Sequence, residues 1–198
     1  DDFVRELDPV GRIDIVASLA KRALDYYKGL PPELRTPDTE RNRAMALVRY
    51  GIVARRQGRN DEGMTVLKEA EAVFRQLRAQ GDDSEPTRLG LANALGYQAA
   101  ILIGQLKVEE AIGFGEAALA EILPLVEGAA KPSNRALREY GDTLTGLGYA
   151  SANFGDARKS MEYLRKSQEV FRQLGAPKAA DLSIDAGYAS ATAWLASA

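Results

Sequence analysis

Apolar side chains recur every three or four residues along much of the chain. After Asn60 this stripe consists of Met64, Leu67, Ala70, Phe74 and Leu77, and after Asp156 of Met161, Leu164, Val170, Phe171 and Leu174. Such spacing places the side chains on one face of an α-helix. No segment alternates apolar and polar residues as a half-buried strand does. The pattern therefore predicts an all-α protein.

Helix-start and turn signals divide this pattern into about eight helices. A capping side chain or a first-turn proline stands at Thr36-Pro37, Ser84-Glu85-Pro86 and Pro132-Ser133. Tight turns followed by the capping candidates Asn60 and Asp156 occur at residues 58–60 and 154–156. The expected helices span residues 10–30, 38–57, 61–80, 86–104, 108–127, 133–154, 157–174 and 178–196. We expect Pro124 to kink the fifth of them near its end.

The chain contains an internal repeat. Residues 73–77 and 170–174 are identical at a shift of 97 residues, and Gly51, Gly58 and Leu67 fall on Gly148, Gly155 and Leu164 at the same shift. A second series starts with glycine and tyrosine at Gly96-Tyr97, Gly148-Tyr149 and Gly187-Tyr188, with Tyr50-Gly51 as a degenerate copy. The glycines of this series are 45, 52 and 39 residues apart. Repeats of this length predict stacked helical hairpins.

These residues resemble the tetratricopeptide repeat family. The family's Leu-Gly position is matched by Tyr50-Gly51, Leu95-Gly96, Leu147-Gly148 and Ala186-Gly187, its turn glycine by Gly58, Gly104 and Gly155, and its later small residue by Ala70, Ala118 and Ser167. The small residues let two helix backbones approach closely. The steps between copies exceed the standard period of about 34 residues, so the chain resembles a long-period variant found inside multidomain bacterial signalling proteins.

The resemblance implies a right-handed superhelical array, or α-solenoid, of antiparallel helix hairpins. We expect one repeat domain over residues 1–198, with repeats at 38–80, 86–127 and 133–174. Residues 10–30 would be a second helix without its first, and residues 178–196 a first helix without its second. Because the sequence opens at Asp1-Asp2 without a methionine, we expect it to be a piece of a longer protein.

In this family the first helix of each repeat lines a concave groove. Positions counted from the repeat glycine identify the residues of this chain that would line it. The resemblance assigns to it Arg49, Ile52, Arg55, Arg56, Asn93, Tyr97, Tyr149, Asn153 and Tyr188. Flat tyrosine side chains suit contact with a peptide. Six arginines between residues 41 and 59 face only Glu40 along the sequence, which favours an acidic or C-terminal carboxylate peptide held by Arg49 and Arg55, with Asn93 on its backbone. The alternative is that the tyrosines fill the interior and the arginines form a solvated face.

Composition removes several kinds of chemistry. The chain has no cysteine and no histidine, which excludes disulfides, zinc sites of the usual Cys/His type and a Ser-His-Asp triad. The formal net charge of −2 gives no global attraction to nucleic acid or an anionic membrane. We expect no metal, no cofactor and a cytoplasmic location. No apolar stretch reaches the length of a membrane span.

Two further patterns suggest chemistry only as strings of residues. Residues 113–118 match the Gly-x-Gly-x-x-Ala dinucleotide fingerprint, but they lie inside an expected helix instead of following a strand. The carboxylates Glu109, Glu110, Glu116 and Glu121 could form an acid–base pair only in a buried cleft, and a solvated helix face is the simpler interpretation. Trp194 is a candidate for an exposed contact or a homodimer through the C-terminal helix.

The sequence thus predicts a non-catalytic scaffold that binds a protein or peptide in a groove. The alternative is a regulatory or oligomerisation segment of a larger signalling protein, whose contacts are intramolecular. Enzymatic activity from carboxylates and nucleic-acid binding by the arginine-rich helix are minor alternatives, the second marked by steep salt dependence.

Overall fold

The fold is all-helical. A computed structural model describes residues 13–177 and 182–197, and in these ranges it contains eight α-helices, one short 3-10 helix and no strand. The helices are α2 (Ile13–Lys28), α3 (Pro37–Arg56), α4 (Asn60–Ala79), α5 (Glu85–Gly104), α6 (Val108–Val126), α7 (Asn134–Phe154), α8 (Ala157–Gln173) and α9 (Leu182–Ser197), with the 3-10 helix η2 (Pro32–Leu34) between α2 and α3. These bounds lie within a few residues of the predicted ones. The parts of the predicted helices at residues 10–12 and 178–181 lie outside the described residues.

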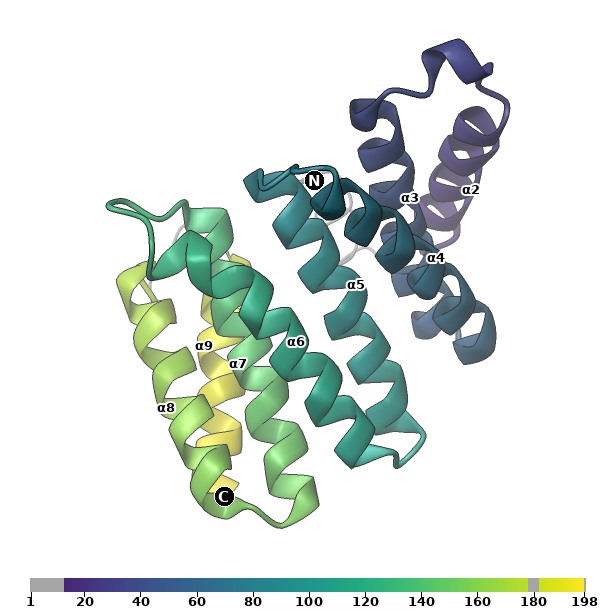
Figure 1. The fold of residues 1–198 in the computed structure, drawn as a ribbon. Helices are drawn as coiled ribbons and strands as arrows, with labels where there is room; N and C mark the ends of the chain where they lie inside the picture. The colour runs from purple at the N-terminus through teal and green to yellow at the C-terminus, as the bar shows by residue number, and fades with distance from the viewer. Residues whose placement is uncertain (1–12, 178–181, 198) are drawn as a thin grey trace. The chain divides into compact units, whose positions relative to one another are not determined.

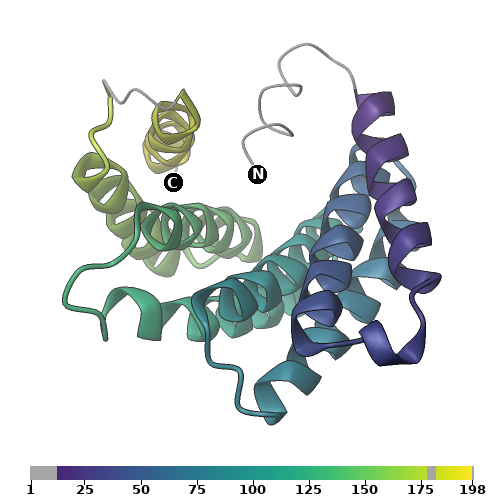
Figure 2. The same ribbon diagram turned by 90° about the horizontal axis from the view of Figure 1, so that it is seen from above.

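The chain forms two compact units, residues 1–97 and 98–198, which meet inside α5. In the first unit α3 packs against both α2 and α4, and in the second α7 packs against α6, α8 and α9 (Figure 1). Viewed from above, α7 has α6 on one side and α9 on the other (Figure 2). Within each unit consecutive helices thus pack side by side, which confirms the predicted class, an all-α array of helix hairpins. The expectation of a single repeat domain over residues 1–198 stays a prediction.

Three predicted capping residues act as caps. The side chain of Thr36 accepts a hydrogen bond from the Thr39 amide at 3.3 Å and Ser133 accepts one from Ala136 at 3.0 Å. The Asp156 carboxylate accepts one from the Lys159 amide at 2.9 Å. The prediction for Asn60 was wrong, because α4 begins at that residue and Arg59 occupies the cap position without a capping side-chain hydrogen bond.

One turn assignment needs correction. Gly58 and Gly155 have φ angles of 75° and 88°, which is the left-handed conformation that glycine adopts at the end of a helix. Gly104, assigned to the same position in the middle repeat, is instead the last residue of α5. The left-handed residue of that turn is Leu106, with φ 62°. Pro124 lies inside α6, two residues before its end at Val126.

Aromatic rings packed against glycines build the cores of both units. Phe74 is fully buried and its ring lies against Gly90, while Phe171 is fully buried and lies against Gly187. Both pairs are related by the 97-residue shift. In the second copy the ring also contacts Gly141, where a Cβ would lie 2.8 Å from Phe171 Cζ. The sequence repeat is therefore also a repeat of packing contacts.

Candidate functional site

The nine predicted groove residues lie on four helices. Arg49, Ile52, Arg55 and Arg56 are on α3, Asn93 and Tyr97 on α5, Tyr149 and Asn153 on α7, and Tyr188 on α9. The first six belong to residues 1–97 and the last three to residues 98–198. The structure brings the α3 residues together on the last two turns of that helix, and it places Asn93 and Tyr97 one turn apart.

The residue after each repeat glycine is accessible in all four copies. Ile52, Tyr97, Tyr149 and Tyr188 are all half-buried, with part of each side chain exposed. Within each unit their helices also carry fully buried side chains, such as Leu47 and Leu144. The shared register position thus faces neither the core alone nor the solvent alone, which is typical of a side chain that can also contact a partner.

The predicted excess of arginine on α3 is reduced by acidic partners that the linear sequence does not show. Arg41 Nη2 lies 2.6 Å from Asp82 Oδ2, and Arg43 Nη1 lies 2.6 Å from Glu69 Oε1. Each guanidinium also pairs with an acid in the first turn of α3, Asp38 and Glu40 respectively. The expectation that only Glu40 opposes these arginines was therefore wrong, since α4 and the loop after it supply further carboxylates.

Arg59 is not part of the arginine-rich helix. The helix α3 ends at Arg56, and Arg59 precedes α4, where its guanidinium pairs with Glu62 and lies 5.6 Å from the centre of the Tyr50 ring. The Tyr50 hydroxyl donates to the same carboxylate. The hydrogen bonds from Tyr50 and from Arg59 lower the pKa of Glu62. This cluster ties the end of one helix to the start of the next.

Three arginines on the last two turns of α3 belong to the predicted groove. Arg49 and Arg55 are half-buried and Arg56 is exposed. Residues 49, 52 and 56 are three and four apart, so they share one face of α3 with Ile52 between the two charges. An apolar side chain between two guanidinium groups can contact a peptide that carries both a carboxylate and an apolar side chain.

Asp82 closes the loop between α4 and α5. Its Oδ2 accepts hydrogen bonds from Thr87 Oγ1 at 2.6 Å and from Arg41 Nη2 at 2.6 Å, and its Oδ1 accepts one from the Ser84 amide at 3.1 Å. Burial alone would raise the pKa of this carboxyl, but the hydrogen bonds from Ser84, Thr87 and Arg41 outweigh it and hold the pKa well below its usual range. A carboxylate kept ionised in this way stabilises the loop and is a poor proton donor at neutral pH.

Two of the predicted tyrosines contact side chains of their own unit. The ring of Tyr149 lies 4.4 Å from the ring of Trp194, at an interplanar angle of 50°. Arg172 lies 5.5 Å from the centre of the Tyr188 ring and 3.3 Å from its hydroxyl. Asn153 donates its side-chain amide to the Tyr149 carbonyl at 2.8 Å. These contacts agree in part with the alternative that the tyrosines fill the interior, although both rings stay half-buried.

The patterns that resembled enzyme sites both lie on α6. Residues 113–118 are in the middle of α6, five residues after its start at Val108, so the requirement of a strand before the dinucleotide fingerprint is not met. Glu109, Glu110 and Glu116 are exposed. In the described residues no group of three or more acidic, histidine or cysteine side chains is placed to hold a metal ion. A search of the same residues found no helix with the length and apolarity of a membrane span.

Comparison with known proteins bears on the fold alone. No family model matches the chain, and no curated protein matches it. Among solved structures, the chain is similar to the crystal structure of BtubC (BKLC) from P. vanneervenii, with a TM-score of 0.64 and 17% sequence identity. The match covers 96% of this chain and 72% of that one. The helical architecture is therefore shared across nearly all of this chain.

Proposed function

We propose that the chain is a non-catalytic scaffold of the tetratricopeptide type that binds a protein or peptide segment through its first helices. The observation that carries this proposal is the shared accessibility of Ile52, Tyr97, Tyr149 and Tyr188, one register position on four successive first helices. In each unit the repeated accessible position offers side chains of successive first helices to a partner. Close contacts of the repeat glycines Gly51, Gly148 and Gly187 support the assignment to the tetratricopeptide family, whereas a Cβ on Gly96 would meet nothing within 4 Å.

The partner's chemistry is inferred from α3. Arg41 and Arg43 pair with Asp82 and Glu69. Further along the same helix lie Arg49, Arg55 and Arg56, the arginines that the repeat register assigns to the groove. We propose that these hold an acidic side chain or a C-terminal carboxylate, with Asn93 and Tyr97 contacting the peptide further along. Guanidinium groups bind carboxylates with paired hydrogen bonds, which gives both affinity and direction. The proposed location is the cytoplasm, and no cofactor takes part.

A titration with a labelled acidic peptide tests this proposal. The probe is a fluorescein-labelled peptide with several glutamates and a free C-terminal carboxylate, and its binding is followed by fluorescence anisotropy. A C-terminally amidated copy shows whether the terminal carboxylate contributes to binding. The double variant Arg49→Ala, Arg56→Ala is expected to weaken binding about tenfold or more, because each charged hydrogen bond is worth roughly 1.5–3 kcal/mol. The matched control is Arg75→Ala, an exposed arginine on α4 paired with Glu71 of the same helix. Equal binding by the double variant and the control would contradict the site.

A second candidate function is oligomerisation or intramolecular regulation through α9. Trp194 is 39% exposed although one side of its ring meets Tyr149, and tryptophan is one of the residue types enriched in protein interfaces. Light scattering at increasing concentration tests this alternative. A dimer that is lost in Trp194→Ala, together with no binding of the acidic probe, would favour it over the peptide-binding proposal.

A further inference from the structure

The turns inside the three helix hairpins share one backbone geometry. In each turn an amide donates to the carbonyl five residues earlier, at 2.8 to 2.9 Å: Arg59 to Ala54, Lys107 to Leu102 and Asp156 to Ser151. In each, the residue before that donor has a positive φ. This is the arrangement in which a left-handed residue ends a helix and satisfies its last carbonyls.

Leucine occupies the left-handed position in only one of these turns. Gly58 and Gly155 have φ angles of 75° and 88°, whereas Leu106 has 62°. For a residue with a branched side chain this conformation is costly, because the Cβ approaches the following carbonyl oxygen. The fold itself favours glycine at this position, as the other two turns show.

Burial does not offset that cost. Leu106 is 87% exposed, so its side chain gains little from the hydrophobic effect within the chain. Phe154, at the end of α7, is 56% exposed. Backbone strain that no internal contact repays is a feature of binding sites. The exposed leucine therefore calls for an explanation outside the fold.

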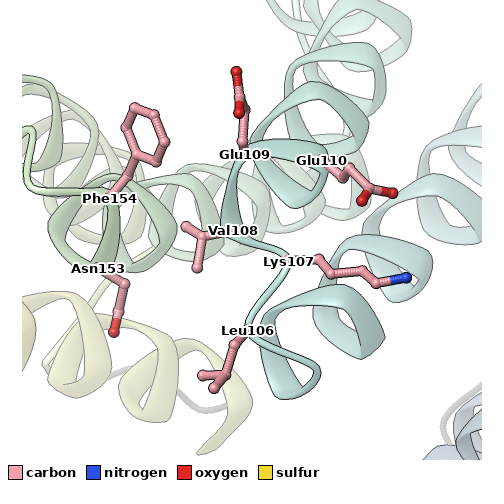
Figure 3. A pocket seen from close by; sticks show the side chains of 7 residues that line it. All are labelled: Leu106, Lys107, Val108, Glu109, Glu110, Asn153 and Phe154. Carbon is pink, nitrogen blue, oxygen red and sulfur yellow. The ribbon is translucent and has the colours of Figure 1, made fainter.

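Leu106 and Phe154 border a hollow on the surface of the second unit. The hollow has a volume of about 450 Å³ and is lined also by Val108 and Asn153 (Figure 3). This volume is within the range of about 300–1,000 Å³ that small ligand sites occupy. In Figure 3 the Phe154 ring rises at one side, and the Val108 side chain extends between it and Leu106. The lining combines three apolar side chains with one amide and three charged side chains, and the hollow is open on one side, so an apolar side chain of a partner can lie against it.

The charges at the rim indicate what flanks that side chain. The ionisable residues of the lining are Lys107, Glu109 and Glu110, one positive and two negative charges. Glu109 rises beside the Phe154 ring, while the Lys107 ammonium extends away from Asn153 (Figure 3). The apolar side chains of the lining thus stand beside two carboxylates and one ammonium group, and the excess of negative charge complements a basic neighbour in the partner.

We propose that this turn hollow binds a peptide segment in which an apolar side chain stands next to lysine or arginine. The apolar side chain contacts Leu106, Val108 and Phe154, and the basic residue pairs with Glu109. The site is separate from the acidic-peptide site proposed on α3, and it selects the opposite charge. The exposed side chain of Leu106, at the left-handed position, forms one wall of the site.

Replacement of the strained leucine by the glycine of the sister turns tests the proposal without risk to the fold. The probe is a fluorescein-labelled peptide with two leucines flanked by lysines, followed by anisotropy with the full 198-residue chain. Leu106→Gly is expected to weaken binding about tenfold, through loss of the apolar contact. The melting temperature of the same variant is expected to stay equal or to rise by about 2–4 °C, because the backbone strain is released. Phe154→Ala is expected to weaken binding to a similar extent.

Control variants and control probes distinguish this site from non-specific hydrophobic binding and from the α3 site. Leu34→Ala removes another exposed leucine, 52% exposed in η2, and should leave binding unchanged. A probe with serine in place of leucine should bind at least about tenfold more weakly, and one with glutamate in place of lysine should lose affinity that Glu109→Gln restores in part. Equal binding by Leu106→Gly and the parent chain would overturn the proposal, as would equal binding of the serine probe. The parent chain could also form a concentration-dependent dimer that Leu106→Gly abolishes, and bind no probe. That result would assign the hollow to a second copy of the chain and would also overturn the peptide-binding proposal.

Discussion

Gly148 faces Leu164 so closely that a Cβ on the glycine would lie 2.5 Å from Leu164 Cγ. The first unit repeats the arrangement, where a Cβ on Gly51 would lie 2.6 Å from Leu67 Cγ. Each pair joins the two helices of one hairpin, α7 with α8 and α3 with α4. The glycine is therefore needed for close approach of the helices, since both positions lie within helices.

Substitution of either glycine should destabilise its hairpin. Gly148→Ala is expected to lower the free energy of unfolding by about 1–3 kcal/mol, because the added methyl group forces a buried leucine to shift. Urea unfolding followed by circular dichroism measures the loss. Gly146→Ala on the same helix is the control, since a Cβ there meets nothing within 4 Å, and it should stabilise by about 0.5–1 kcal/mol through helix propensity. If both variants changed stability alike, the close approach would not be the cause.

Removal of the leucine should cost more than addition of the methyl group. Leu164 is fully buried, and Leu164→Ala is expected to cost about 2–5 kcal/mol through lost burial and the cavity left behind. Because α7 and α8 pack extensively on each other, the loss should appear as unfolding of both helices together. Native-state hydrogen exchange would show this as joint loss of protection in α7 and α8. A loss below about 0.5 kcal/mol would contradict the packing described.

The Asp82 cluster predicts a specific dependence of stability on pH. The folded-state pKa of Asp82 lies below the unfolded value, which is near about 3.9. Its stabilisation is therefore fully present above the unfolded value and is lost as the pH falls through the folded pKa. Asp82→Asn should lower stability by about 1–3 kcal/mol at pH 7, and the difference from the parent chain should shrink as the pH falls below about 4.

Urea unfolding at pH 7 and pH 3 measures this difference. Glu169→Gln, at an exposed position on α8, is the control and should change stability by less than about 0.5 kcal/mol. A difference for Asp82→Asn that stays constant between the two pH values would show that ionisation of this carboxyl does not stabilise the loop.

The single tryptophan reports on the contact between α7 and α9. Because Tyr149 covers part of the Trp194 ring, the fluorescence maximum of the folded chain should lie at shorter wavelength than that of the unfolded chain. Tyr149→Ala is expected to shift the maximum toward longer wavelength, since water gains access to the indole ring. Tyr149→Phe keeps the ring and should leave the maximum unchanged. An unchanged maximum in the alanine variant would mean that the two rings do not meet in solution.

Local signals in the sequence predicted the helices well. Caps such as Thr36, Ser133 and Asp156 act over three or four residues, and turn glycines such as Gly58 and Gly155 act through their own backbone. Both kinds of signal are contained in a short window of sequence, so the helix bounds follow from it. The assignment of Gly104 to the turn failed because glycine is the usual left-handed residue at a helix end. The backbone shows that Leu106, two residues later, takes that conformation.

The candidate sites depended on contacts between residues far apart in the chain. The sequence shows six arginines close together, but Asp82 and Glu69, which neutralise two of them, lie 41 and 26 residues away from their partners. The hollow beside Leu106 was missed for the same reason, since Phe154 approaches it from another helix. Comparison of the three hairpin turns, two with glycine and one with leucine, was the signal that could have identified it.

The sequence by itself determined the helical class, the repeat and the removal of cysteine and histidine chemistry, because apolar spacing and residue identity are local properties. The tertiary structure decided which charges are already paired, which aromatic rings are covered and where an apolar side chain remains exposed at a backbone cost. Those properties depend on what packing brings near each residue, and neither periodicity nor composition contains that information.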